Sequence, residues 1–294
     1  MKRYNNLGEL LIDYRKLYDI SQHDFAAALD VDVRTIQRWE KNATLVKFEK
    51  EADLVELTFL PHQLIRNLNA IIPIPTFFDF SIRKYSLSKL SNDLPDIQEI
   101  KNFIDFPSNQ IRTINPQTDL RHIKRYVNFR YENKNIIKDD VLKQAIKLIP
   151  NANLFLTDMA GFYSGHILTL PISQEAYQKL RNRTISNNEL KCSDLVNFRT
   201  QSPPVFYGYS ITADSNDGAY YIIGAALKFI RDLKLKDYTY CAITNRYDSV
   251  NTVIKLGMHV IWEVKQTSVN CKSSPKIRFY EGNFNGFLSS KGSY

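Results

Sequence analysis

The sequence predicts two folded parts, a small all-α bundle at the N-terminus and a larger α/β domain with a mixed sheet behind it. Three observations support this. Apolar residues recur at three- and four-residue spacing from Leu7 to about Leu60, which is typical of helices. Prolines then interrupt residues 61 to about 115, and helix interiors do not tolerate them. After Thr118, apolar runs of strand length alternate with helical patterns, which favours a sheet covered by helices.

The composition is that of a globular protein. Hydrophobic residues make up 44% of the 294 residues and aromatic residues 12%, whereas no apolar run approaches the ~18 residues of a membrane span. Charges run through the N-terminal stretch, so we expect it to be neither a signal peptide nor an anchor. The three cysteines share no C-x-x-C spacing, so we expect reduced thiols in a cytoplasmic protein. The five histidines are scattered, and no metal site is expected.

The positive charge is distributed unevenly along the chain. The net charge is +8, yet residues 1–60 hold nine basic and eleven acidic side chains. The excess of positive charge therefore lies downstream of the predicted bundle. A DNA-binding function for the bundle must depend on where its cations sit and cannot be inferred from the overall charge.

Three helices are predicted in the N-terminal bundle. The first carries one apolar stripe, formed by Leu7, Leu10, Leu11, Tyr14, Leu17 and Tyr18. Ser21 is expected to cap a short second helix, with Asp24 near the position of a capping box. Asp32 is the natural N-cap of a third helix, which turns Ile36 and Trp39 inward and leaves its other face free.

Two short helices joined by a tight turn inside a helical bundle describe a helix-turn-helix. The segment "SQHDFAAALDVDVRTIQRWEKNAT" resembles the Cro/phage-repressor helix-turn-helix of the xenobiotic-response-element (XRE) family of regulators. The match covers the Ser-Gln opening, Phe25 with Ala26, Val31, Ile36 and the "RWEKN" ending. Asp30 stands where glycine is usual, and aspartate tolerates a left-handed turn.

This resemblance implies that the exposed start of the third helix enters the major groove of double-stranded DNA. The implied base-edge readers are Val33, Arg34, Gln37 and Arg38, and the implied phosphate contacts are Gln22 and Lys41. The alternative is that the two arginines only solvate one face of the bundle. Because the segment is acidic overall, we expect a homodimer that reads two half-sites.

Residues 63–115 are predicted to form an ordered connector between the bundle, residues 1–62, and the C-terminal domain, residues 116–294. The connector is rich in proline and contains aromatic residues that must be covered, Phe77, Phe78, Phe80, Tyr85, Phe103 and Phe106. We expect it to pack on one of the domains or on a second subunit. The cations of residues 81–90 either contact the DNA backbone or form a solvated face.

Helices and strands alternate in the C-terminal domain. Helices are predicted over 118–134, 138–149, 173–180 and 217–233, with a further helix that ends at Gly257 as a C-cap. Strands are predicted over 152–160, 163–172, 204–213, 238–243, 259–264 and 276–282, the first two as a hairpin. A mixed sheet with helices on both faces follows from this order.

Three segments of this domain, "DSNDG" before the long helix, "YCAITN" and "SVNTVIKLGMHVIWE", resemble the GCN5-related N-acetyltransferase (GNAT) superfamily. The resemblance covers about residues 116–283. It implies that the strands on either side of the long helix splay apart, that acetyl-CoA or another acyl-CoA threads the gap, and that its pyrophosphate sits at the glycine-rich helix N-terminus. The residues that it implies for the cofactor are Gly224, Ala225, Ala226, Asn245 and Ser249.

The same resemblance leaves enzymatic activity open. The family's phosphate loop opens with glutamine or arginine where this chain has Tyr221, and Ile222 and Ile223 follow it. The family's general-acid tyrosine aligns with Val253, no general base is identifiable, and the catalytic residues are unknown. Three hypotheses therefore stand. The first is a DNA-binding regulator whose GNAT-like domain senses a ligand or dimerises, and the second is an active N-acetyltransferase that the helix-turn-helix targets to DNA or to a partner protein. The third is a protein-interaction module in which both ancestral functions are lost.

Overall fold

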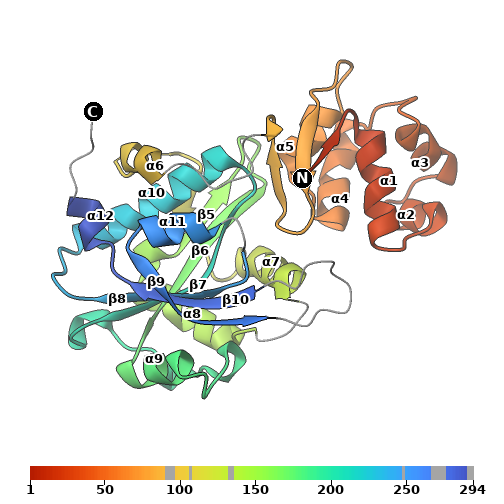
Figure 1. The fold of residues 1–294 in the computed structure, drawn as a ribbon. Coiled ribbons are helices and arrows are strands. Elements are labelled where there is room, and N and C mark those ends of the chain that lie inside the picture. The colour runs from red at the N-terminus through yellow and green to blue at the C-terminus, as the bar shows by residue number, and fades with distance from the viewer. Residues whose placement is uncertain (90–96, 106–107, 132–135, 247–248, 266–275, 290–294) are drawn as a thin grey trace. The chain divides into compact units, whose positions relative to one another are not determined.

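The chain forms two compact units in a computed structural model that describes residues 1–89, 97–105, 108–131, 136–246, 249–265 and 276–289 (Figure 1). Unit 1 comprises Met1–Asn92 and Asp158–Ser164, and unit 2 comprises Asp93–Thr157 and Gly165–Tyr294. The predicted connector is thus shared between the two units, and the division into three parts stays a prediction. Pro95, Phe106, Pro107 and Cys271 lie outside the described residues.

The first three helices of unit 1 are those predicted, and further helices follow them. In order, the helices are α1 (Leu7–Leu17), α2 (Gln22–Ala28), α3 (Val33–Glu40), α4 (Phe48–Thr58) and α5 (His62–Leu68). One apolar core joins them, and its largest fully buried side chains include Tyr4, Phe25, Leu10, Leu11, Ile36 and Leu54. The apolar stripe of α1 is confirmed at four positions, whereas Leu17 and Tyr18 are exposed because they lie at the end of the helix.

Unit 1 also contains a small sheet that the sequence pattern does not reveal. Strand β1 (Lys2–Tyr4) pairs antiparallel with β2 (Thr76–Asp79), which pairs antiparallel with β3 (Lys84–Ser86). Phe78 on β2 is buried in the helical core. The first part of the predicted connector therefore packs on the bundle.

The turn between β5 (Leu154–Thr157) and β6 (Tyr163–Ile172) belongs to unit 1. Its Asp158 carboxylate lies 3.1 Å from Nδ1 of the buried His62, and Nε2 of the same ring lies 3.5 Å from the buried Glu51. The ring of Phe162 stacks on His62 at 4.1 Å. These contacts attach the turn to α4 and α5.

A seven-stranded sheet forms the centre of unit 2, in the order β4-β5-β6-β7-β8-β10-β9. The remaining strands are β4 (Ile111–Thr113), β7 (Val205–Ala213), β8 (Thr239–Thr244), β9 (Met258–Lys265) and β10 (Lys276–Gly282). Strands β7 and β8 are parallel, and the pairs of β4 with β5, β6 with β7, β8 with β10 and β9 with β10 are antiparallel. The predicted mixed sheet is confirmed.

Helices cover both faces of this sheet (Figure 1). They are α6 (Ile97–Phe103), α7 (Leu120–Tyr131), α8 (Asp139–Leu148), α9 (Gln174–Arg181), α10 (Asn216–Asp232), α11 (Val250–Lys255) and α12 (Asn285–Ser289). Helix α6 comes from the predicted connector and packs on α10, where Ile100 joins Leu227 and Ile230 in one core. Gly257 follows α11 with φ of +103°, which confirms the predicted C-cap.

The described residues contain no candidate for a membrane span or a metal site. No described helix is long and apolar enough to cross a membrane, and no group of metal-ligating side chains occurs within the described ranges. Cys192 and Cys241 are free thiols, and burial raises the pKa of the Cys241 thiol well above its usual value.

Candidate functional site

Helices α2 and α3 form a helix-turn-helix whose caps are those predicted. The Ser21 hydroxyl accepts a hydrogen bond from the Asp24 amide at 3.1 Å, and the Asp32 carboxylate accepts one from the Arg34 amide at 2.7 Å. Asp30 has φ of +51°, the left-handed conformation that glycine would otherwise supply in the connecting turn. These local interactions fix where each helix begins.

The inner face of the helix-turn-helix anchors it to the core of unit 1. Phe25 and Ile36 are fully buried, and Trp39 is 5% exposed. Val33 is half-buried and packs against the same core. Because the buried residues of α3 lie on one face, its other face is turned to solvent.

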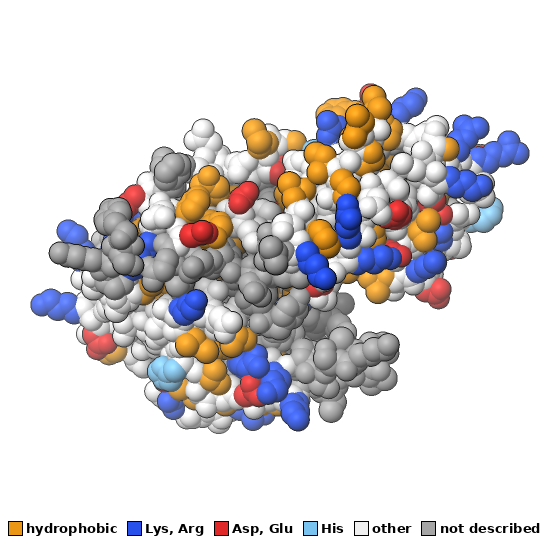
Figure 2. Space-filling view, turned by 45° about the horizontal axis from the view of Figure 1, so that its top comes forward, with side chains coloured by type: hydrophobic (Ala, Val, Ile, Leu, Met, Phe, Trp, Pro, Cys, Tyr) orange, Lys and Arg blue, Asp and Glu red, His pale blue; other side chains and the backbone are white. Residues whose placement is uncertain are grey.

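The predicted base readers lie mostly on that solvent face. Arg34, Gln37, Arg38 and Lys41 are exposed, and Gln22 at the start of α2 is half-buried. Val33 offers only part of its side chain to a base, because the rest packs on the core. Figure 2 shows Lys and Arg side chains at the end of unit 1 where Figure 1 has α2 and α3.

A hydrogen-bond network centred on Glu40 holds these two helices and α1 together. The Gln22 side-chain amide donates to Glu40 Oε2 at 2.6 Å, and the Arg15 guanidinium donates to both carboxylate oxygens of Glu40. Arg15 also donates to the Ile20 carbonyl at 2.8 Å, and Gln37 donates to Gln22 Oε1 at 3.4 Å. The network therefore orients Gln22 and Gln37 before any ligand is bound.

Sequence reasoning missed Arg15 and Glu40 as parts of this surface. Both are polar residues that the pattern leaves on a solvated face, yet the Glu40 side chain is only 6% exposed and that of Arg15 14% exposed. Their separation of 25 positions gives no local signal. A carboxylate at the end of α3, together with an arginine on α1, becomes informative only once the two helices are known to be in contact.

In unit 2, β7 and β8 diverge as the GNAT-like resemblance implies. They pair in parallel only from Val205 with Thr239 to Gly208 with Ala242, although β7 continues to Ala213. Arg246, which follows β8, is buried, and its guanidinium donates to Thr212 Oγ1 at 3.2 Å and to Tyr126 Oη at 3.3 Å. An arginine side chain thus lies beside the part of β7 that β8 leaves unpaired.

The predicted phosphate-binding segment does not lie at a helix N-terminus. Helix α10 begins at Asn216, so Gly224 lies in its third turn. A Cβ on Gly224 would come within 2.7 Å of the Phe103 carbonyl oxygen and 2.9 Å of its carbonyl carbon. The glycine therefore makes room for helix α6 and leaves none there for a diphosphate. This corrects the predicted role of Gly224.

Neighbouring residues of that segment are also engaged by protein. Tyr221 packs edge to face on Phe103, with ring centroids 5.1 Å apart. Ala226 is half-buried in the core between α10 and β5. At the actual start of α10, Ser215 caps the helix, and Asp217 lies in its first turn. A carboxylate there disfavours a diphosphate at the positive end of the helix.

The other implied cofactor residues have partners within unit 2. Asn245 Oδ1 accepts a hydrogen bond from Arg130 at 2.6 Å, and the Ser249 hydroxyl donates to the Arg246 carbonyl at 3.0 Å. Two tyrosines of β7, which the resemblance does not assign to the cofactor, also have partners: Tyr207 donates to Asn187 Oδ1 at 2.7 Å, and the Tyr209 hydroxyl accepts from the Ile137 amide at 3.2 Å. None of these contacts brings the five implied residues into one cluster.

Comparison with known protein families identifies the N-terminal part of the chain. Residues 11–53 match the helix-turn-helix family model. No curated protein matches the chain.

Solved structures that resemble the chain cover its C-terminal part. One is Naa50 from Arabidopsis thaliana in complex with the bisubstrate analogue CoA-Ac-MVNAL. Its sequence identity is 10%, the match covers 59% of this chain and 97% of that chain, and the TM-score is 0.39. Arylalkylamine N-acetyltransferase 2 from Aedes aegypti has 10% identity, coverage of 60% and 100%, and a TM-score of 0.38. Ard1 from Thermoplasma volcanium has 13% identity, coverage of 58% and 94%, and a TM-score of 0.35. Similarity at this level bears on neither ligand nor reaction.

Proposed function

We propose that this protein is a sequence-specific, DNA-binding transcriptional regulator that reads the major groove with α3. The observation that carries the proposal is the exposed face of α3, with Arg34, Gln37 and Arg38 beside a Gln22 that Glu40 holds in place. Arginine can donate two hydrogen bonds to guanine, and each such contact contributes about 1–3 kcal/mol of discrimination against the wrong base. Phosphate contacts by Gln22 and Lys41 fix the position of the helix on the duplex.

The acidic surroundings favour a dimer that reads two half-sites. Asp24, Asp30 and Asp32 are exposed near the readers, and their charges oppose the approach of phosphates. A homodimer doubles the number of base and phosphate contacts, and it places its half-sites about one helical turn of DNA apart. We expect the protein to act in this form in the cytoplasm.

The proposed role of unit 2 is to sense a small ligand. Three features support sensing over catalysis: the helix that covers Gly224, the guanidinium of Arg246 beside β7, and the apolar Val253 at the position implied for a general acid. An acyl transfer without an acid positioned to protonate the leaving thiolate loses a contribution of about 10²–10⁴-fold to its rate. Unit 2 would then bias DNA binding through the ligand that it holds.

Selection of bound DNA from a random pool by the full-length protein tests the proposal. We expect an enriched sequence with two related half-sites, and an affinity for it that falls steeply as the salt concentration rises. A pool that stays random, or enrichment that does not survive competition with unrelated DNA, would contradict specific recognition.

The second candidate is an active N-acetyltransferase, and the divergence of β7 from β8 favours it. Past Gly208, β7 does not pair with β8, and an extended ligand could add to β7 on that side. Calorimetry with acetyl-CoA, followed by a turnover assay over a panel of amines, separates the two candidates. Turnover would establish the second candidate. Saturable binding of acetyl-CoA without turnover would favour sensing of an acyl-CoA.

A further inference from the structure

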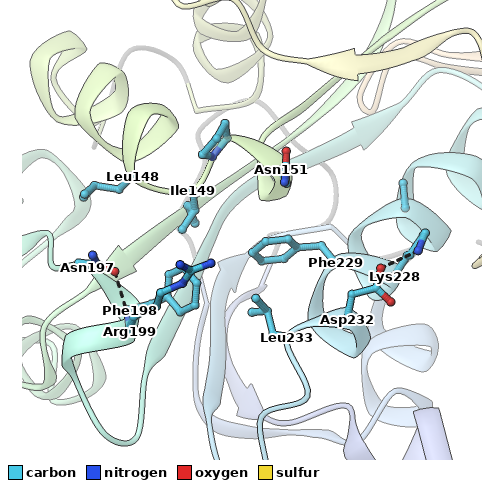
Figure 3. A pocket seen from close by; sticks show the side chains of 12 residues that line it. Leu148, Ile149, Asn151, Asn197, Phe198, Arg199, Lys228, Phe229, Asp232 and Leu233 are labelled. Carbon is cyan, nitrogen blue, oxygen red and sulfur yellow. Dashed lines mark hydrogen bonds and ion pairs between the residues drawn. The ribbon is translucent and has the colours of Figure 1, made fainter.

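A hollow of about 560 Å³ opens on unit 2 where three of its elements meet. They are the 3₁₀ turn Pro150–Ala152, the 3₁₀ turn Phe198–Thr200 and the last turns of α10 (Figure 3). The volume lies within the range of small-molecule sites, which is about 300–1,000 Å³. Every residue that lines the hollow belongs to unit 2 and is described by the structure.

The hollow is separate from the gap between β7 and β8. Its wall at residues 197–199 precedes the first residue of β7, and its other wall is the C-terminal half of α10. The gap opens at the opposite, C-terminal end of β7, past Gly208. Of the five residues implied for the cofactor, only Ala225 lines the hollow, so a ligand there would not occupy the gap between the two strands.

Two aromatic rings form apolar walls of the hollow. Phe198 and Phe229 are half-buried, and each contacts the fully buried Phe206, with ring centroids 5.6 and 6.4 Å apart. These contacts hold both rings in place from behind. Figure 3 shows the Phe229 ring pointing across the hollow toward Phe198 and Arg199.

One positively charged side chain in the lining has no ionic partner among the described residues. The Lys228 ammonium lies 2.6 Å from the Asp232 carboxylate, so their charges compensate each other. The Arg199 guanidinium lies 5.6 Å from the Phe198 ring, and among the residues that the structure describes it has neither a hydrogen bond nor an ion pair. The lining thus presents a single guanidinium beside the Phe198 ring.

We propose that this hollow binds a small aromatic carboxylate, with the ligand ring between Phe198 and Phe229 and the carboxylate on Arg199. A guanidinium matches a carboxylate with two parallel hydrogen bonds, and aromatic rings pair favourably with a third ring between them. A phosphate ester would bring a second negative charge, for which the lining offers only the ammonium that Asp232 already holds. This proposal names the class of ligand that unit 2 would sense. Only the step from ligand binding to regulation of DNA binding rests on the proposed function.

Calorimetric titration of the full-length protein with 3-phenylpropionate tests the site. The comparison ligands are 3-phenylpropan-1-ol, which lacks the charge, and propionate, which lacks the ring. We expect saturable binding of 3-phenylpropionate and at least a tenfold weaker interaction with either comparison ligand. Absence of saturable binding at millimolar concentration, or equal affinity for the alcohol, would overturn the proposal.

Two arginine variants make the assignment specific. We expect Arg199→Gln to weaken binding of 3-phenylpropionate about tenfold or more, and Arg121→Gln, an exposed arginine at the start of α7 outside the hollow, to leave it unchanged. Equal affinity in Arg199→Gln and the natural protein would place the ligand elsewhere. Thermal unfolding of each variant confirms that the fold is retained.

The binding titration needs no DNA, so its failure and that of the proposed function are distinguishable. Fluorescence anisotropy on the selected operator, with and without 3-phenylpropionate, then measures the coupling. A protein that binds the ligand but no DNA would leave the site intact and refute the regulator. A protein that binds DNA but no ligand would refute the site and leave the regulator intact.

Discussion

Replacing Gly224 with alanine separates two explanations of this glycine. If the glycine makes room for α6, the new Cβ meets the Phe103 carbonyl oxygen at 2.7 Å and its carbonyl carbon at 2.9 Å. Overpacking of this kind costs about 1–3 kcal/mol. Alanine is favoured over glycine within a helix by about 1 kcal/mol. We therefore expect a net loss of up to about 2 kcal/mol in the free energy of unfolding.

The clash cannot be relieved by shortening a side chain, since its two nearest atoms are backbone. Helix α6 must move instead, and the segment that follows it is tied to α10 by the ion pair between Asp105 and Arg231, with one N–O distance of 2.8 Å. We thus expect Phe103→Ala to leave the cost of Gly224→Ala nearly unchanged when the two are combined, which a double-mutant cycle measures.

Urea unfolding of the full-length protein, followed by circular dichroism, is the assay, and Gly286→Ala is the matched control. Gly286 lies in helix α12, and a Cβ there would meet no atom within 4 Å. The control should keep or gain stability, because alanine favours a helix. If Gly224→Ala also gained about 1 kcal/mol, the glycine would not serve the approach of α6, and our account of α10 would be refuted.

Three further outcomes follow from single side chains. Glu40→Ala should weaken operator binding by about 0.5–1.5 kcal/mol, because Gln22 must then be ordered on binding; an unchanged gel shift would show that the network does not prepare the surface for DNA. Glu281→Gln should destabilise unit 2 by about 1–2 kcal/mol at neutral pH. Burial alone would raise the pKa of this carboxyl, but its hydrogen bonds outweigh burial and lower it. The stabilisation is therefore fully present above the unfolded pKa of a glutamate, about 4.3, and is lost as pH falls below it through the lower folded pKa, as unfolding across pH would show. His62→Ala should lower the free energy of unfolding by about 1–3 kcal/mol, whereas loss of the exposed His23 should not.

Local signals in the sequence are sufficient for the helix-turn-helix. The caps at Ser21 and Asp32 and the inward positions of Ile36 and Trp39 follow from propensity and periodicity over a few residues. Most strands of the α/β unit were predictable for the same reason, because each is a run of apolar residues between turn signals. Strand β4 was not, since Ile111–Thr113 contains one apolar residue and lies in the segment predicted as a connector.

Features that depend on distant partners were not predictable. Strand β1 is three residues long, and its partner β2 lies more than seventy positions away. A small residue in a helix indicates close approach, but whether a ligand or another helix approaches Gly224 depends on Phe103, which is remote in sequence. The same holds for Arg15 with Glu40 and for Arg246 with Thr212, since polar residues far apart carry no pairing signal of their own.

The measurement that tests the central claim most directly is operator affinity of a double variant, Arg34→Ala with Arg38→Ala, in a gel shift at fixed salt. We expect binding to weaken by about 1–3 kcal/mol for each arginine that no longer reaches a base, and discrimination against unrelated DNA to fall with it. The control is Arg3→Ala with Lys16→Ala, which removes the same charge from exposed positions on β1 and α1. Unchanged affinity in the first variant, or an equal loss in both, would contradict groove recognition by α3.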